Sequence, residues 1–383
     1  MGTKTGVYVH IPFCVSKCAY CDFLSFTENS KELIEAYIRA LLSEITHSER
    51  LKGLKLESVF FGGGTPSILS ASELTKILKE IARKAEISTA EITLEANPAG
   101  YSIGLDTAKF KELKNAGFNR ISIGLQAAQD QLLAAIGRAH TNDDFLRTYE
   151  AVVSAGFENI NTDIMYALPG QTKGDLAHTL HQVKSLKIPH ISAYSLTIEE
   201  TTPFGQLIRD GMLDLPGEDA QRDFSDQVLH SLTDAGYTWY EISNFARQGY
   251  ECRHNKLYWT RQNYIGFGLG AHSFISNTRW HNTCAMDVYV AAKGKSANIV
   301  HHTKDLSLTE QMEEFIFLGL RMIDGVSVDD FKQHFGESIF SRYGKQICKY
   351  ESLGLLELYL NRLRLTSCGI NVSNAIMADF IYD

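Results

Sequence analysis

The sequence lacks long hydrophobic runs, excess basic charge and frequent proline: only 7 of its 383 residues are proline. The longest apolar stretches, such as residues 315–320, fall far short of the roughly 20 residues that cross a bilayer. Lys and Arg total 37 against 45 Asp and Glu, which argues against nucleic acid as a partner. Hydrophobic residues make up 44% and charged residues 21%, a balance that excludes disordered and fibrous chains.

Seven cysteines are present, and their spacing is the first chemical signal. The N-terminal residues contain no hydrophobic signal segment, so we expect a cytoplasmic protein whose cysteines are metal ligands or free thiols. Cys14, Cys18 and Cys21 form a Cys-x3-Cys-x2-Cys cluster, while the other four cysteines are scattered. With His10 as a fourth ligand the cluster could bind zinc; three thiolates could instead hold a 4Fe–4S cluster with one open iron.

Strand and helix patterns alternate along the first 235 residues. Apolar strand-like runs occur at 7–13, 58–61, 91–95, 120–124, 159–164 and 190–194, and amphipathic helices at 32–48, 72–85, 106–115, 142–155 and 173–186. Asn29 with Glu32, and Ser70 with Glu73, match the capping box that begins a helix. Six such units predict an α/β fold built on a partial (β/α)6 barrel, because a complete barrel has eight.

The remaining sequence is less regular. We interpret residues 1–240 as the barrel, 241–300 as a connecting segment across the barrel mouth, and 301–383 as a small C-terminal helical domain. The C-terminal domain ends in a predicted hairpin at 355–366, so it resembles a winged helix. Acidic residues outnumber basic ones in it, which favours a packing or docking role over DNA binding.

The motifs at the ends of the first two strands together resemble the radical S-adenosylmethionine (SAM) superfamily. They are the cysteine cluster, with Tyr20 before its third cysteine, and the Gly62-Gly63-Gly64-Thr65-Pro66 turn. Over nearly the whole chain the likeness extends to the coproporphyrinogen III dehydrogenase-like subfamily. The resemblance implies a 4Fe–4S cluster on Cys14, Cys18 and Cys21.

The same resemblance implies a SAM site. Its contacts would come from Tyr8, Tyr20, Gly62, Gly63, Gly64, Thr65, Glu95, Gln126, Arg138 and Asp163. Glu95 could accept hydrogen bonds from the ribose hydroxyls, and the planar Arg138 guanidinium could pair with a carboxylate. Without the cysteine motif, Glu95 would be interpreted as a loop carboxylate and Arg138 as a solvated helix end.

Two departures separate the chain from the dehydrogenase itself. Phe23 stands where that enzyme typically carries a fourth cysteine, and the first cluster cysteine is already residue 14, without the long N-terminal extension. The segment His254-Asn255-x-x-Tyr258-Trp259 instead resembles the radical-SAM haem chaperones, the HemW-like proteins.

The resemblance to the haem chaperones implies haem as a ligand. The His254 imidazole could ligate haem iron, with Cys252 as a weaker alternative; a structural His–Asn pair with buried aromatics is the other interpretation. His272 is expected to line the same mouth, and His301 and His302 to lie on the surface.

We therefore expect a haem chaperone that binds the cluster, SAM and haem and delivers haem to apo-haemoproteins, such as respiratory enzymes. The cluster would need a reductant, and both a homodimer and a membrane-associated acceptor are compatible with this interpretation. The alternatives are an oxygen-independent coproporphyrinogen III dehydrogenase, another radical SAM enzyme, and a zinc-stabilised binding module.

Overall fold

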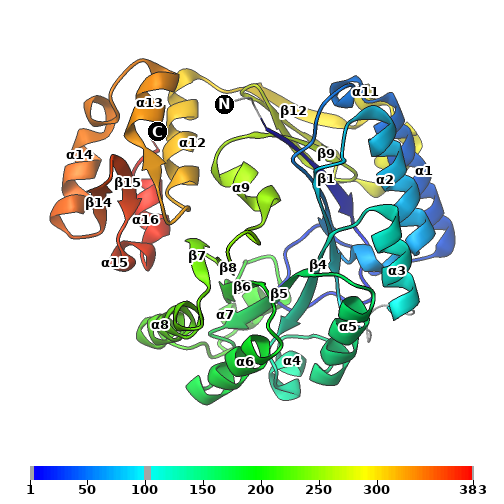
Figure 1. The fold of residues 1–383 in the computed structure, drawn as a ribbon, viewed down its shortest axis with the longest axis horizontal. Helices are drawn as coiled ribbons and strands as arrows, with labels where there is room; N and C mark the ends of the chain where they lie inside the picture. Colours follow the sequence, from blue (N-terminus) through cyan, green and yellow to red (C-terminus); the bar gives the residue numbers. More distant parts are fainter. Residues whose placement is uncertain (1–3, 99–104, 382–383) are drawn as a thin grey trace.

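The computed structural model describes residues 4–98 and 105–381, so the outer domain limits 1 and 383 lie outside the described residues (Figure 1). The strands are β1 (Thr5–Ile11), β2 (Ser58–Gly63), β3 (Glu91–Ala96), β4 (Arg120–Gln126), β5 (Asn159–Tyr166), β6 (His190–Ser195), β7 (Thr238–Glu241), β8 (Asn244–Ala246), β9 (Asn263–Phe267), β10 (His272–Ile275), β11 (Thr278–Asn282), β12 (Val300–Asp305), β13 (Val326–Ser327), β14 (Leu356–Tyr359) and β15 (Arg362–Leu365). The helices are α1 (Lys31–His47), α2 (Ala71–Lys84), α3 (Thr107–Ala116), α4 (Asp130–Ala135), α5 (Asn142–Ser154), α6 (Lys173–Ser185), α7 (Pro203–Arg209), α8 (Glu218–Asp234), α9 (Arg253–Trp259), α10 (Met286–Ala292), α11 (Ser296–Ile299), α12 (Leu308–Gly319), α13 (Val328–Phe335), α14 (Ile339–Ser352), α15 (Ser367–Ile370) and α16 (Ser373–Ala378), with two short 3-10 helices at Glu49–Leu51 and Pro66–Ile68.

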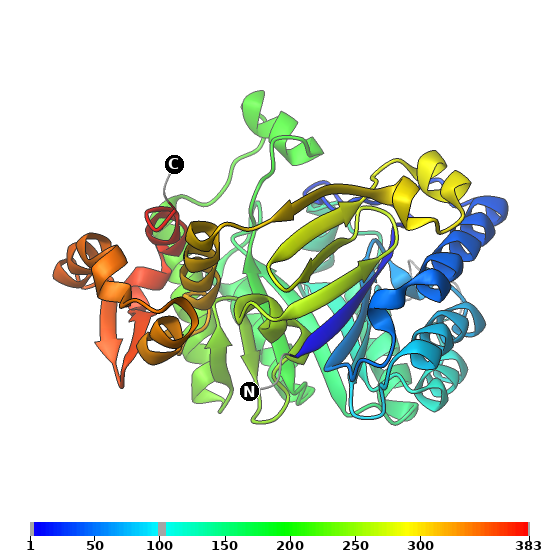
Figure 2. The same cartoon turned by 90° about the horizontal axis from the view of Figure 1, so that it is seen from above.

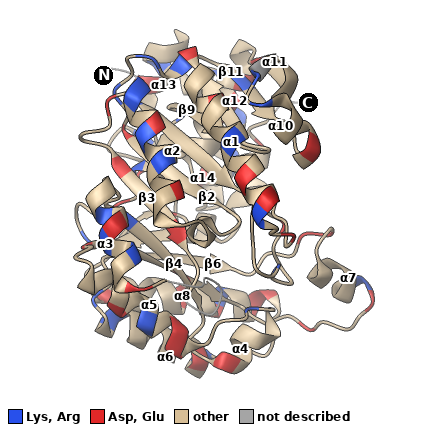
Figure 3. Ribbon diagram, turned by 90° about the vertical axis from the view of Figure 1, so that its right-hand side faces the viewer, with Lys and Arg blue, Asp and Glu red and all other residues tan. Residues whose placement is uncertain are grey.

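The architecture is a curved sheet of twelve strands with helices outside it. Strands β1 to β6 are parallel and lie side by side in chain order, which confirms the predicted partial barrel. Figure 1 shows α1, α2, α3, α5 and α6 outside this sheet and α9 inside it. Lys, Arg, Asp and Glu are interspersed along these outer helices (Figure 3).

Alternation along the strands separates the two faces of the sheet. In β1, the side chains of Val7, Val9 and Ile11 belong to the main hydrophobic core. The intervening Tyr8 and His10 point to the other side, because successive residues of a strand face opposite ways. Among the helices that cover the outer face, α2 begins with the expected Ser70–Glu73 capping box.

Residues 241–300 do not lie across the barrel mouth, and that expectation is wrong. Strands β7 and β8 extend the sheet beyond β6, while β9 to β12 extend it beyond β1. The expected boundaries at 240 and 300 both fall within strands of this one sheet, β7 and β12. The segment therefore belongs to the barrel and widens it at both edges.

The C-terminal unit has its own hydrophobic core and a three-stranded sheet in the order β13-β15-β14. The predicted hairpin is formed by β14 and β15, and helices α12 to α16 pack around it. Figure 2 shows this unit beside the barrel, reached through β12 and α12. Within residues 4–98 and 105–381, none of the helices combines the length and the hydropathy of a transmembrane span.

Candidate functional site

The cysteine cluster lies in a loop that follows β1 and folds back on itself. The Cys14 N–H donates to the Phe26 carbonyl at 2.9 Å, and the Phe26 N–H donates to the Pro12 carbonyl at 2.7 Å. The Asn29 side chain donates to the Cys14 carbonyl at 2.7 Å. Asn29 therefore anchors the loop and does not cap α1, a correction to the sequence interpretation; Ser30 is the cap.

Two side chains from other elements donate hydrogen bonds to the cluster sulfurs. The Thr65 hydroxyl lies 3.6 Å from Cys14 Sγ, and Arg138 Nη1 lies 3.6 Å from Cys18 Sγ. Burial raises the pKa of the Cys21 thiol; a backbone hydrogen bond at Phe23 opposes this, and the neighbouring Cys18 and Cys14 add to it. Hydrogen-bond donors such as Thr65 and Arg138 stabilise thiolates, the form of cysteine that binds metal.

The donor set fits an iron–sulfur cluster better than a single zinc ion. His10, the possible fourth zinc ligand, is held by both ring nitrogens: Nδ1 is 3.0 Å from the Tyr8 hydroxyl and Nε2 donates to the Leu24 carbonyl at 2.9 Å. In the part of the chain that is described, no three His, Cys, Asp or Glu side chains converge on one ion. In a 4Fe–4S cluster each thiolate binds a different iron, so its ligands need not converge.

A pocket borders this loop at the ends of β2, β3 and β4. Its walls include most of the side chains predicted to bind cluster or SAM, namely Cys14, Cys18, Tyr20, Cys21, Gly63, Gly64, Thr65, Glu95, Gln126, Arg138 and Asp163. The sequence interpretation missed Asn97, Ser122 and Gly124, which also line it. Tyr8, Gly62 and His254 are not among the lining residues.

Two glycines allow the cysteine loop to approach the end of β2. A Cβ on Gly64 would lie 2.7 Å from the Phe13 carbonyl oxygen, and Gly63, at φ +113°, would place one 2.5 Å from the His10 ring. The main chains also meet directly, since the Thr65 N–H donates to the Phe13 carbonyl at 2.7 Å. The glycines are thus required by contacts within the protein, whatever binds in the pocket.

The far wall of the pocket is shaped by Gln126 and Arg138. Gln126 has φ 69°, a left-handed conformation that is uncommon for a residue with a side chain, and it follows a register shift in β4. Arg138 Nη2 donates to Asn97 Oδ1 at 3.0 Å and to the Gly124 carbonyl at 3.1 Å. Asn97 in turn donates to Thr65 Oγ1 at 2.7 Å. Asn97 could have been found in the sequence, because it comes directly after a strand, as do the loop residues that were found.

The floor of the pocket holds two carboxyl groups. Burial, with the nearby Asp163 charge, raises the pKa of Glu95 to about 8, although the Gly63 N–H donates to it at 3.3 Å. Burial also raises the pKa of Asp163, against hydrogen bonds from Asn161 and Ser192. The predicted strand 159–164 would place Asp163 near its end. In the structure β5 continues to Tyr166, so Asp163 lies within the strand. A ligand that donates hydrogen bonds or carries positive charge would favour the ionised forms.

His254 lies elsewhere, at the N-terminal ends of the strands. It is 1% exposed, with Nδ1 2.7 Å from the Ser58 hydroxyl and Nε2 2.9 Å from the Tyr258 hydroxyl. Ser58 begins β2, at the end of the barrel opposite the cysteine loop. Neither nitrogen is open to a haem iron in this arrangement, so the structure contradicts the expected role and supports the structural one.

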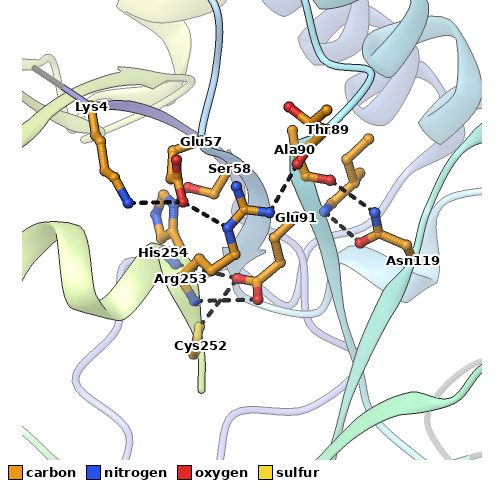
Figure 4. A network of polar contacts seen from close by, with 11 residues as sticks. Lys4, Glu57, Ser58, Thr89, Ala90, Glu91, Asn119, Cys252, Arg253 and His254 are labelled. Carbon is orange, nitrogen blue, oxygen red and sulfur yellow. Dashed lines mark hydrogen bonds and ion pairs between the residues drawn. The ribbon is translucent and has the colours of Figure 1, made fainter. Parts of the chain in front are cut away.

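Glu91 fixes α9 in that position, as Figure 4 shows. Its carboxylate, at the start of β3, accepts from the backbone N–H groups of Arg253 and His254 at 3.2 Å each. Cys252, the other candidate haem ligand, is fully buried and its thiol lies 3.6 Å from the same carboxylate. A carboxylate at the N-terminus of a helix is favourable because it satisfies free N–H groups.

Comparison with known proteins gives consistent results along the chain. Residues 8–183 match the radical SAM superfamily, and residues 306–372 match the HemN C-terminal domain. The chain is 37% identical to the heme chaperone HemW of Lactococcus lactis, over 99% of this chain and 97% of that protein. It is 36% identical to the heme chaperone HemW of Bacillus subtilis, over 98% of this chain and 99% of that protein.

Among solved structures, the coproporphyrinogen III oxidase HemN of Escherichia coli, described as a radical SAM enzyme, aligns with a TM-score of 0.84. The alignment covers 99% of this chain and 90% of that one at 22% identity. At that identity the likeness supports the fold alone.

Proposed function

The chain belongs to the family of HemW heme chaperones within the radical SAM superfamily, and from this premise we propose that it binds haem and delivers it to apo-haemoproteins. The observation that carries the proposal is the likeness to those chaperones over nearly their whole length. The superfamily implies a 4Fe–4S cluster and SAM as cofactors. We further propose a cytoplasmic location, a separate reductant for the cluster, and respiratory enzymes as acceptors.

Residues of the pocket would hold both cofactors. Cys14, Cys18 and Cys21 would hold the cluster, with Thr65 and Arg138 donating to the thiolate sulfurs. When bound, the reduced cluster supplies an electron that weakens the sulfonium C–S bond of SAM. Arg138 keeps a planar guanidinium at the pocket wall that suits a carboxylate.

Glu95 and Asp163 would receive the polar side of SAM from the pocket floor. As carboxylates they accept hydrogen bonds from hydroxyl groups and attract a sulfonium charge. Both line the pocket together with the cysteines, which favours one shared site for cluster and SAM. Tyr8 lies behind the pocket and would support this floor. Gly62 lies next to both side chains, because a Cβ on Gly62 would be 3.0 Å from Glu95 Oε2 and 3.1 Å from the Tyr8 ring.

Coproporphyrinogen III dehydrogenase is the second candidate, favoured by the match of residues 306–372 to the HemN C-terminal domain. Against it, Phe23 occupies the place of the fourth cysteine and is 65% exposed at the rim of the pocket. A phenyl ring offers no metal ligand there.

The test is anaerobic reconstitution with iron and sulfide, followed by haem titration with and without SAM and by transfer to an apo-haemoprotein. We expect about four irons per chain, a haem absorption band, and transfer to the acceptor. Replacing Cys18 by Ser should remove most of the iron, because two thiolates hold a cluster poorly. Cys348→Ser is the matched control, since that cysteine is exposed and remote in sequence. Robust conversion of coproporphyrinogen III by the reconstituted protein would overturn the proposal.

A further inference from the structure

A second pocket lies between the extended edge of the sheet and the C-terminal unit. It is bounded by β10, β11 and β12 on one side and by α12 on the other. Three histidines line it: His272, His281 and His302. From the sequence, His272 was expected at the barrel mouth and His302 on the surface, and His281 was not singled out. They come from three different strands, so only strand pairing brings them together.

Strand register places these imidazoles side by side. His272 is directly opposite His281 between β10 and β11. Lys304 is opposite Arg279 between β11 and β12, so His302, two residues before Lys304, lies on the same face as Arg279 and His281. The ring centroids of His272 and His281 are 5.0 Å apart, and those of His281 and His302 are 5.1 Å apart. Residues that are opposite each other on paired strands share one face of the sheet.

That face is the inner one, which also carries Tyr8. Phe274, two residues after His272, is opposite Tyr264 of β9, and Tyr264 is opposite Gly6 of β1. Gly6 and Tyr8 point the same way because they are two residues apart. The histidines therefore lie on the concave side of the sheet, as does the floor of the cysteine pocket.

The His281 ring is oriented as a metal ligand. Its Nδ1 lies 2.9 Å from the Asn282 carbonyl oxygen, and a carbonyl can only accept, so Nδ1 carries the proton. In the neutral ring Nε2 then has the free lone pair, and no hydrogen bond involves that atom among the residues described. Haem and metal sites commonly use an imidazole whose other nitrogen donates to a carbonyl.

The pocket also suits the rest of an iron porphyrin. Leu306 and Phe317 supply apolar lining for the macrocycle, and Arg279 and Lys304 supply cations near its edge. Two of the three α12 carboxylates that line the pocket form ion pairs: Glu314 with Arg279 at 2.8 Å and with Arg261 at 3.1 Å, and Glu310 with Lys304. The cations thus neutralise the carboxylates, and porphyrin propionates would point towards the solvent.

The pocket adjoins the cysteine loop through the turn before β10. A Cβ on Gly270 would lie 2.5 Å from the Leu24 side chain, which belongs to the loop after Cys21. His272 follows only two residues later. A ligand on these histidines would therefore lie near the loop that follows the cluster cysteines.

We propose that haem binds in this pocket, with His281 Nε2 as the axial ligand of the iron. The inference rests on the proposed function, since it names the place where the chaperone would carry its haem. His272 stacks against His281 and supports the ring.

The test is haem titration of the anaerobically reconstituted full-length chain, followed by absorption and electron paramagnetic resonance spectroscopy. We expect His281→Ala to lose the histidine-ligand signature and at least tenfold in haem affinity, with the iron content of the cluster unchanged. Free imidazole should restore the signature, because it can enter the space that the side chain left. His334→Ala is the matched control, since that exposed histidine also bonds a carbonyl through Nδ1 but lies outside the pocket.

The outcomes separate the inference from the proposed function. If the wild-type chain binds haem and His281→Ala binds it equally, with an unchanged spectrum, the pocket assignment is wrong and the chaperone function stands. If the wild-type chain binds no haem, the proposed function fails and the inference with it. An unfolded His281→Ala would show as lost iron; His281→Cys, which replaces the imidazole by a thiolate, should then shift the haem spectrum, and no shift would overturn the assignment.

Discussion

Replacing His254 by Ala should destabilise the protein without changing the haem spectrum. The substitution removes one buried and one partly buried hydrogen bond and leaves the hydroxyls of Ser58 and Tyr258 without this partner. Each unsatisfied buried group costs about 1–3 kcal/mol. The ring also stacks on Phe60, with centroids 5.0 Å apart, so a cavity adds to the loss. We expect a decrease of about 3–5 kcal/mol in the free energy of unfolding.

Urea denaturation, followed by circular dichroism, measures this decrease, and haem titration of the same variant measures the ligand role. His178→Ala, at an exposed position of α6, is the control and should change stability by less than about 0.5 kcal/mol. The reasoning fails if His254→Ala keeps wild-type stability and loses haem.

The same residue predicts a dependence on pH. Burial lowers the pKa of His254 to about 3, with the Arg120 charge adding to the effect, from about 6.5 in the unfolded chain. Its stabilising contribution is therefore complete above pH 6.5 and is lost as the pH falls towards 3. Between pH 7 and pH 5 this amounts to about 2 kcal/mol. The difference in stability between wild type and His254→Ala should shrink by that amount at pH 5.

Two further predictions concern the cysteine pocket. Because the pKa of Glu95 is raised to about 8, its ionised fraction should rise roughly tenfold from pH 7 to pH 9, and SAM should bind up to about tenfold more tightly. Calorimetry should show this increase in SAM affinity with pH in the wild type but not in Glu95→Gln. An equal dependence of SAM affinity on pH in both proteins would refute the role of the carboxylate. Gly64→Ala should cost about 1–3 kcal/mol and lower the iron content, because its Cβ would lie 2.7 Å from the Phe13 carbonyl oxygen. In Gly174→Ala the nearest atom would be 3.6 Å away, so that control should retain its stability and iron, and equal behaviour of the two variants would contradict the packing argument.

Local patterns in the sequence were sufficient for the barrel, and the resemblance to the radical SAM superfamily supplied most residues of the cysteine pocket. The alternation in β1 and the capping box of α2 depend on neighbouring residues, and the structure shows both. The pocket could be predicted because parallel strands end at the same edge, so Gly63, Glu95 and Gln126 had to meet.

The position of residues 241–300 could not be predicted in this way. β9 pairs with β1, and no local pattern says which distant strand a segment will join. His254 was assigned to the mouth because its motif was interpreted apart from Glu91 and Ser58, the residues that hold it at the other end. The histidine pocket was missed for the same reason, since it depends on the register of three strands.

The position of β1 between β2 and β9 has a consequence for synthesis on the ribosome. One edge of β1 can pair once residues 58–63 have emerged, but its other edge waits for residues 263–267. At about 5–20 residues per second that delay is roughly 10–40 s, during which one edge of an apolar strand beside the thiols remains unpaired. Iron–sulfur assembly factors and molecular chaperones would thus compete for the same nascent segment. Slow translation would favour misfolding over insertion of the cluster.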